Sequence, residues 1–169
     1  MDGLVTNPEK EALLLQLTAQ REHILGATNG LDEAALRRPV LPSGWSCLGL
    51  VNHLAIDVER FWFGAVVKGD DGIISEETDE QDDAWRVRPE VTVEAVFDGY
   101  RREIELADAI ISSTSLEAPP AWWPDFFGDW RLNTFREILL HVLTETAVHA
   151  GHLDAACELI DGRTWLTLT

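Results

Sequence analysis

Residues 139–152 have the sequence LLHVLTETAVHAGH, which is apolar on almost every side of a helix. A helix of this composition is predicted to be buried. At about 100° per residue, a single arc of about 80° holds four ionisable side chains: His141, Glu145, His149 and His152. Ionisable groups on a buried stripe need partners, because an unpaired buried charge costs several kcal/mol. This stretch therefore predicts both a core helix and a polar site on it.

The spacing of Glu145 and His149 permits a metal site. A carboxylate and an imidazole at positions i and i+4 point the same way and can bind one ion. The third ligand would come from another helix, where His53 is the other histidine in an apolar setting. Taken singly, each histidine is better explained as a structural residue with a hydrogen-bond partner, and an ExxxH match in a helix is a weak signal by itself. We assign no role to His23, which has no ligand near it in the sequence.

Helical periodicity predicts four long helices in an all-α chain. Their ranges are Asn7 to about residue 25, about Ser46 to Val67, near Thr92 to Ile111, and Thr134 to Ile160. Asparagine, proline and the capping-box spacing mark helix starts, and a glycine after the last helix marks its end. Four such helices predict one domain, residues 1–169, folded as a four-helix bundle. The long connection between the second and third helices permits an up-down-down-up order with one crossover.

Composition limits the classes of function. The net charge of −17 argues against binding to nucleic acid or to an anionic membrane surface. No apolar run reaches the roughly 20 residues of a membrane span, and the N-terminal residues lack the pattern of a signal peptide. We expect a cytoplasmic protein, and a homodimer is compatible with the sequence. Cys47 and Cys157 form no CxxC pair and are expected to be buried structural thiols.

Two connections are unusual. Residues 70–83 contain eight carboxylates and no basic residue, which favours a solvated loop, with capture of a cationic partner as the alternative. The connection over residues 115–133 holds five closely spaced aromatic residues: Trp122, Trp123, Phe126, Phe127 and Trp130. These side chains could plug one end of the bundle or form a wall of a substrate pocket, and the two roles are compatible.

Two blocks of the chain resemble the DinB-like superfamily. The first covers residues 42–55, PSGWSCLGLVNHLA, with VERFWF at residues 58–63, and the second is ETAVHAGHLD at residues 145–154. The closer likeness is to the branch that includes mycothiol-dependent maleylpyruvate isomerase and the mycothiol or bacillithiol S-transferases. The likeness extends from the first helix to Ile160.

The resemblance implies a divalent metal, commonly zinc or nickel, between the second and fourth helices. Its ligands would be His53, Glu145 and His149, whereas many relatives have histidine at the position of Glu145. Asp57, His141 and His152 are then candidates to orient the ligands or to replace one of them. Three protein ligands leave a coordination position open, as in catalytic sites.

The function that the resemblance favours is metal-dependent S-transfer, with mycothiol or a similar small thiol activated as thiolate and joined to an electrophile. The isomerase of this branch carries an additional C-terminal domain, whereas this sequence extends only nine residues beyond Ile160, so S-transfer is expected rather than isomerisation. Two alternatives stay open: a metal-dependent hydrolase, and a metal-binding stress protein without catalytic activity.

Overall fold

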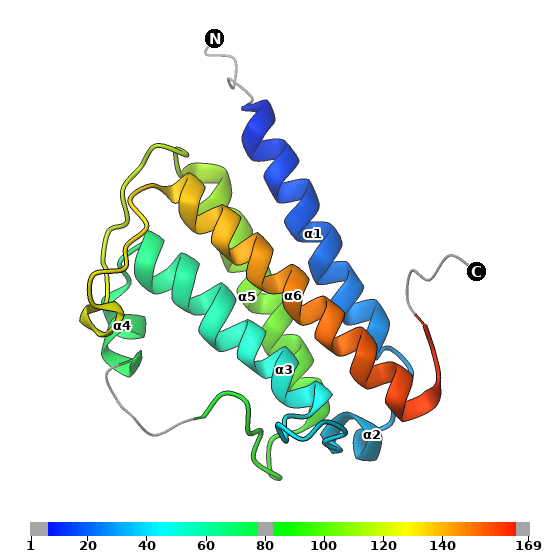
Figure 1. The fold of residues 1–169 in the computed structure, drawn as a ribbon. Coiled ribbons are helices and arrows are strands. Elements are labelled where there is room, and N and C mark those ends of the chain that lie inside the picture. The colour runs from blue at the N-terminus through cyan, green and yellow to red at the C-terminus, as the bar shows by residue number, and fades with distance from the viewer. Residues whose placement is uncertain (1–6, 78–82, 165–169) are drawn as a thin grey trace.

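The computed structural model describes residues 7–77 and 83–164, and all regular elements within these ranges are helical. Figure 1 shows the long helices lying side by side. The long elements are α1 (Pro8–Thr28), α3 (Cys47–His53) with its direct continuation η1 (Leu54–Val67), α5 (Val93–Ser113) and α6 (Phe135–Asp161). The short ones are α2 (Glu33–Arg37), α4 (Asp71–Glu77) and η2 (Asp125–Phe127). The prediction of an all-α protein is confirmed.

The predicted start of α1 and both predicted ends of α6 are confirmed by their caps, whereas α1 continues past its predicted end near residue 25 to Thr28. The Asn7 side chain accepts hydrogen bonds from the N–H groups of Glu9 and Lys10, each at 3.1 Å. Thr134 and Glu137 form the predicted capping box at the start of α6. Gly162 ends that helix with φ 78°, a left-handed conformation that glycine adopts without steric cost. Local chemistry therefore defines where these helices begin and end.

The helix predicted over residues 46–67 has the expected ends but two hydrogen-bonding patterns. Ser46 caps its start, and its side-chain oxygen accepts a hydrogen bond from the Gly49 N–H at 3.1 Å. From Leu54 onward the helix is of the π type, in which each N–H bonds to the carbonyl five residues earlier. π-helical segments are rare in proteins, and those that occur are often located at functional sites. The change of pattern falls directly after His53.

The prediction that residues 70–83 form a solvated loop was wrong for the first half of this range. Asp70 accepts hydrogen bonds from the N–H groups of Gly72 and Ile73, and helix α4 follows. Ile73 packs against the core, and Gly64 on η1 permits this approach because a Cβ there would overlap the Ile73 side chain. A cap and two packed isoleucines therefore outweigh the acidic composition. Residues 78–82 lie outside the described residues.

The long helices enclose one continuous apolar core, with α1 against α6 and α5 against η1. Arg21 crosses this core: it binds both carboxylate oxygens of Glu59 at 2.7 Å and Asp108 at 2.7 Å. The composition of α6 suggested a helix that is buried on every side, and this prediction was wrong. Leu140 and Val148 are 44% and 52% exposed, because only one face of α6 meets its neighbours.

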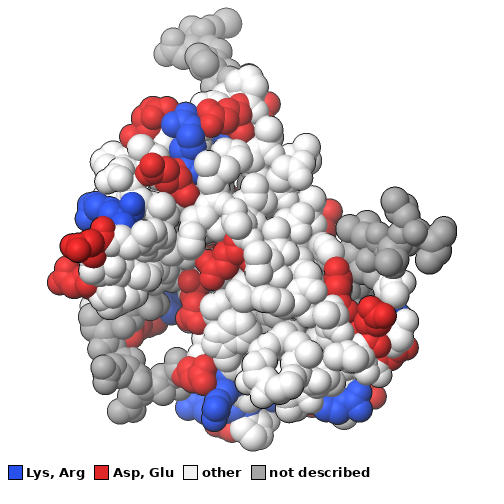
Figure 2. All heavy atoms as spheres, viewed as in Figure 1, with Lys and Arg blue, Asp and Glu red and all other residues white. Residues whose placement is uncertain are grey.

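Figure 2 shows acidic side chains at the edges of one face and also near its centre, with broad uncharged areas between them. Both cysteines are buried and free, as predicted. Within the described ranges, no helix combines the length and apolar character needed to cross a membrane.

Candidate metal centre

The structure brings together the three side chains predicted as ligands. His53 is the last residue of α3, whereas Glu145 and His149 lie one turn apart on α6. Oε1 of Glu145 lies 3.8 Å from Nε2 of His53 and 3.9 Å from Nε2 of His149. One ligand atom from each residue can be chosen so that all three lie within 4.8 Å of one another. With zinc–ligand distances of about 2.0–2.2 Å, two ligands of one ion lie at most about 4 Å apart. The two distances from Glu145 satisfy this limit.

The hydrogen bonding of the His53 imidazole fits a bound cation. Nδ1 of His53 lies 2.7 Å from Oδ2 of Asp57, so its other ring nitrogen faces Glu145. That atom, Nε2 of His53, and Nδ1 of His149 are buried without a hydrogen-bond partner among the described residues. Leaving a buried polar atom unpaired costs about 1–3 kcal/mol. An ion between these side chains would remove the penalty for the nitrogen atom that binds it.

Electrostatics prepare two of the three groups for metal binding at neutral pH. Burial raises the pKa of Glu145, but the nearby imidazoles of His141 and His53 outweigh this effect and hold the pKa at about 2. Burial, together with the charge of His53, lowers the pKa of His149 to about 4. Burial also lowers the pKa of His53, but the interactions with Asp57 and Glu145 dominate and raise it above its ordinary value. A proton on His53 is therefore the main competitor of a cation.

Of the two additional histidines on the predicted stripe, one joins the group. Nε2 of His141 lies 3.3 Å from Oε2 of Glu145, and its ring packs edge-on against Trp62 at 4.7 Å. His152 is exposed, and its ring centroid lies 5.6 Å from that of His149 without contacting Glu145. His23, to which no role was assigned, lies 2.8 Å from Asp154 on α6.

A cavity of about 340 Å³ opens beside two of the three candidate ligands, His53 and Glu145. Its polar wall consists of His53, Asp57, His141 and Glu145. Its apolar wall consists of Phe61, Trp62, Phe126, Phe127 and Trp130. Three of the five aromatic residues predicted as a pocket wall are thus part of it.

The other two predicted pocket residues stand behind this wall. The Trp122 ring lies edge-on to Phe61 with centroids 6.3 Å apart. Trp123 packs against Trp62, and its indole N–H donates a hydrogen bond to the carbonyl of Trp130 at 3.2 Å. These contacts hold the aromatic segment in place. Trp122 and Trp123 therefore have the packing role that was predicted, whereas Phe126, Phe127 and Trp130 line the cavity.

Sequence reasoning missed Trp85. Its indole stacks on the His53 imidazole with ring centroids 4.1 Å apart and an angle of 20° between the planes. It also meets the His149 ring at 5.4 Å. Trp85 lies in an irregular segment directly after the acidic stretch, where no periodicity assigns it a face. The sequence signal that could have drawn attention to Trp85 was its position as a single aromatic residue directly after a charged segment.

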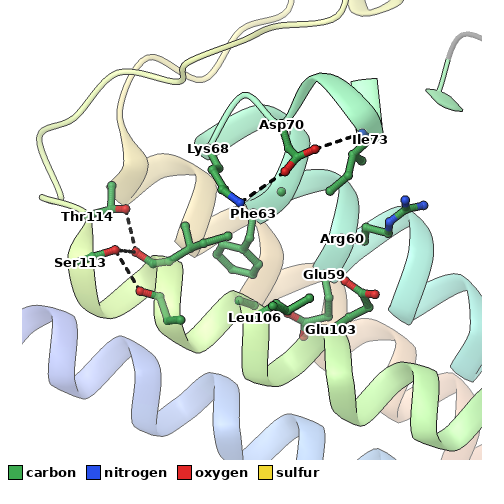
Figure 3. Close-up of a pocket in the computed structure, with 14 residues that line it drawn as sticks. Glu59, Arg60, Phe63, Lys68, Asp70, Ile73, Glu103, Leu106, Ser113 and Thr114 are labelled. Carbon is green, nitrogen blue, oxygen red and sulfur yellow. Dashed lines mark hydrogen bonds and ion pairs between the residues drawn. The ribbon is translucent and has the colours of Figure 1, made fainter. Parts of the chain in front are cut away.

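A larger cavity, of about 420 Å³, lies between η1, α4 and α5 (Figure 3). It shares no lining residue with the cavity beside the candidate ligands. Its deepest carboxylate, Glu59, is held by Arg21, and Lys68 on its rim is paired with Asp70 at 3.3 Å. The charges of Glu59 and Lys68 are thus balanced by their ion-pair partners. The smaller cavity, which is lined by two histidines and the Glu145 carboxylate, is the better candidate for a reactive site.

The fold and this site define an all-helical protein in which two helices bring two imidazoles and a carboxylate together beside an aromatic cavity. The model of the mycothiol S-transferase family matches residues 12–162, nearly the whole chain. The chain therefore belongs to this family, which is part of the DinB-like superfamily. No curated protein and no solved structure matched the chain.

Proposed function

We propose that this protein is a metal-dependent S-transferase that joins a small thiol of the mycothiol type to an electrophile. The observation that carries the proposal is the convergence of His53, Glu145 and His149 in a chain of the mycothiol S-transferase family. We also propose the topology that the sequence permits, an up-down-down-up four-helix bundle with one crossover between η1 and α5. In that arrangement one ligand comes from the second long helix and two come from the fourth.

The chemistry of the donors suits zinc or nickel. Two neutral imidazoles and one carboxylate leave a net positive charge on a divalent ion, which when bound would lower the pKa of a thiol and favour its thiolate. Three protein ligands would leave room for one external ligand. The adjoining cavity, about 340 Å³ in volume, supplies that room on the side of Asp57 and Glu145.

The residues of this chain would bind and orient both substrates. The apolar wall of Phe61, Trp62 and Trp130 would hold the electrophile and exclude water. His141, which lines the same cavity, is placed to accept the proton that the thiol loses. With a chlorinated electrophile, the sulfur–carbon bond forms as the carbon–chlorine bond breaks. Chloride leaves, and the proton passes from His141 to solvent.

The experiment is thiol consumption by zinc-loaded protein with a chlorinated or an epoxide electrophile. We expect the wild type to exceed the uncatalysed rate and His149→Ala to lose this acceleration. Asp98→Asn on the exposed side of α5 is the matched control and should match the wild type. Hydrolysis of esters or amides without thiol turnover would replace this proposal with a metal-dependent hydrolase. Metal binding without either activity would leave a non-catalytic metal-binding protein.

A further inference from the structure

Trp85 is placed against both imidazoles of the candidate centre. Its indole covers one face of His53, with centroids 4.1 Å apart and planes inclined by 20°. The same indole lies 5.4 Å from the His149 ring, which approaches it at 61°. The two imidazoles lie 5.0 Å apart, edge to face. One tryptophan therefore contacts both nitrogen ligands, although it lies on neither helix that carries them.

The backbone of residues 83–85 is fixed to α3, which makes this placement specific. The Asn52 side-chain amide donates a hydrogen bond to the Ala84 carbonyl at 2.8 Å. The Asp83 carboxylate accepts one from the Trp85 N–H at 3.1 Å. A Cβ at Gly49 would overlap the Trp85 carbonyl oxygen, so the close approach requires glycine at that position of the helix. Two contacts with α3 and one hydrogen bond within the segment thus determine where the indole lies.

As a result, His53 is constrained around most of its ring. Asp57 holds Nδ1 at 2.7 Å, Trp85 covers one face and the His149 ring meets it from another direction. The remaining polar atom, Nε2, is buried and faces Glu145. Rotation of the imidazole would break the hydrogen bond and the stack together. The ring is therefore held in one orientation before any ligand binds.

The cavity lies elsewhere around the ligands. Asp57, Phe61 and Trp62 line it, whereas Trp85 and His149 do not. The side of the imidazoles that Trp85 covers is thus separate from the side that opens to the cavity. An external ligand would have to approach from the cavity.

We propose that Trp85 is a positioning residue of the metal centre, which holds both imidazoles in binding orientation and confines an incoming thiol to the aromatic cavity. This role rests on the proposed metal-dependent function. Residues that orient metal ligands typically contribute 10–100-fold to metal affinity. An aromatic residue that only filled the core would have no such effect, because any side chain of similar volume would replace it.

The test uses the full chain loaded with Co²⁺, whose visible d–d absorption reports coordination number and ligand geometry. Absorption spectra and the rate of cobalt release to excess chelator are measured for wild type, Trp85→Leu and Trp85→Phe. Trp45→Leu is the control, since Trp45 lies 6.3 Å from the Trp85 ring but contacts neither ligand. We expect Trp85→Leu to release cobalt about 10-fold faster or more, with a changed spectrum. Trp85→Phe, which keeps a stacking ring, and Trp45→Leu should both stay close to the wild type.

A second variant tests the same role if Trp85→Leu does not fold. Gly49→Ala leaves the indole intact but displaces it, and alanine favours a helix by about 1 kcal/mol over glycine. We expect this variant to show the same spectral change and faster release as Trp85→Leu. Cobalt release and spectra equal to those of the wild type in Trp85→Leu, or in Gly49→Ala if the former is unfolded, would overturn the role of Trp85 alone. A wild-type protein that binds no cobalt would overturn the metal centre itself.

Discussion

Oδ2 of Asp57 lies 2.7 Å from Nδ1 of His53, one turn further along the same continuous helix. This contact fixes which nitrogen of the imidazole is free, because a carboxylate accepts the proton of Nδ1 and leaves Nε2 as the basic atom. The orientation of the first ligand is therefore determined within one helix. The orientation of the other two depends on how α6 packs against it.

Asp57→Asn tests this orientation. The amide keeps the shape of the side chain but removes the negative charge that stabilises the N–H of His53. We expect zinc affinity to fall about 10–100-fold, with the far-ultraviolet circular dichroism unchanged. Competition with a chromophoric chelator measures the affinity. Asp98→Asn, in an exposed pair with Arg101, serves as the control and should bind zinc like the wild type.

Zinc affinity should depend on pH chiefly through His53. Its pKa is raised, despite burial, by Asp57 and Glu145, so a proton occupies the ligand below that value and must leave before zinc binds. Affinity should therefore fall as the pH is lowered through this raised pKa. The pKa values of about 4 for His149 and about 2 for Glu145 lie below this range, so these groups add no dependence there. Affinity that is constant between pH 8 and pH 5.5 would contradict the assignment of His53 as a ligand.

The metal-free protein should lose stability on acidification because of His149. Its pKa in the folded state, about 4, is lower than the ordinary histidine value of 6.5. A lowered pKa contributes stability that is fully present above the unfolded value and is lost as the pH falls from 6.5 towards 4. The raised pKa of His53 acts in the opposite sense, since its contribution is present below 6.5 and is lost as the pH rises through its folded value. Comparing urea midpoints of wild type and His149→Phe across this range isolates the His149 contribution, which the phenylalanine variant should lack.

Zinc should stabilise the fold by binding to the native state alone. At a free zinc concentration 100 times Kd, the stabilisation is about 2.7 kcal/mol. For a domain of this size, that corresponds to a rise in Tm of about 5–10 °C. Glu145→Gln should keep the fold but show a much smaller rise, because the amide is a poor zinc ligand. Equal Tm values for zinc-loaded and chelator-treated wild type would contradict native-state binding.

The buried ion pair gives a prediction that does not involve the metal. Arg21 and Glu59 are 2% and 1% exposed, and their charges balance inside the core. Arg21→Ala should reduce the free energy of unfolding by about 3–5 kcal/mol, because it leaves the Glu59 carboxylate buried without its partner. The double variant Arg21→Met, Glu59→Leu should recover most of this loss, since it removes both charges and keeps the volume. Urea denaturation measures both, and a loss below about 1 kcal/mol for Arg21→Ala would contradict the claim that this variant leaves an uncompensated buried charge on Glu59.

Much of the fold follows from local sequence. Asn7, Thr134 and Gly162 determine helix ends through bonds to their own neighbours, so the sequence alone was sufficient to place them. The spacing of Glu145 and His149 likewise predicts that they share a face, because helical geometry depends only on position along the chain. His53 required a further argument, since its approach to α6 depends on packing between distant segments.

Other features could not be predicted because they arise from contacts between distant residues. The helix at residues 71–77 forms where isoleucines reach the core past Gly64, an effect that an acidic composition conceals. The indole of Trp85 meets His53 because Gly49 and Asn52 hold its backbone. Arg21 and Glu59 lie on different helices with unrelated patterns, and their pairing appears only when those helices pack.

The proposed role of His141 as proton acceptor can be distinguished by experiment from a role as metal ligand. His141 lies 3.3 Å from Glu145 and lines the cavity. His141→Gln should lower kcat about 100-fold, the lower range for loss of a general base, while zinc content stays at the wild-type level. Loss of zinc together with activity would instead make His141 a ligand. A kcat near that of the wild type would exclude it from proton transfer.

At the centre of the proposed function, one ion is held by His53, Glu145 and His149 and accepts a small thiol beside them. X-ray absorption at the zinc edge, recorded before and after addition of the thiol, tests this arrangement most directly. We expect a first shell of nitrogen and oxygen with two imidazole ligands, and the appearance of one sulfur scatterer when thiol is added. Sulfur in the first shell before thiol addition would indicate binding by Cys47 or Cys157. A spectrum that the thiol does not change would contradict thiol activation at this centre.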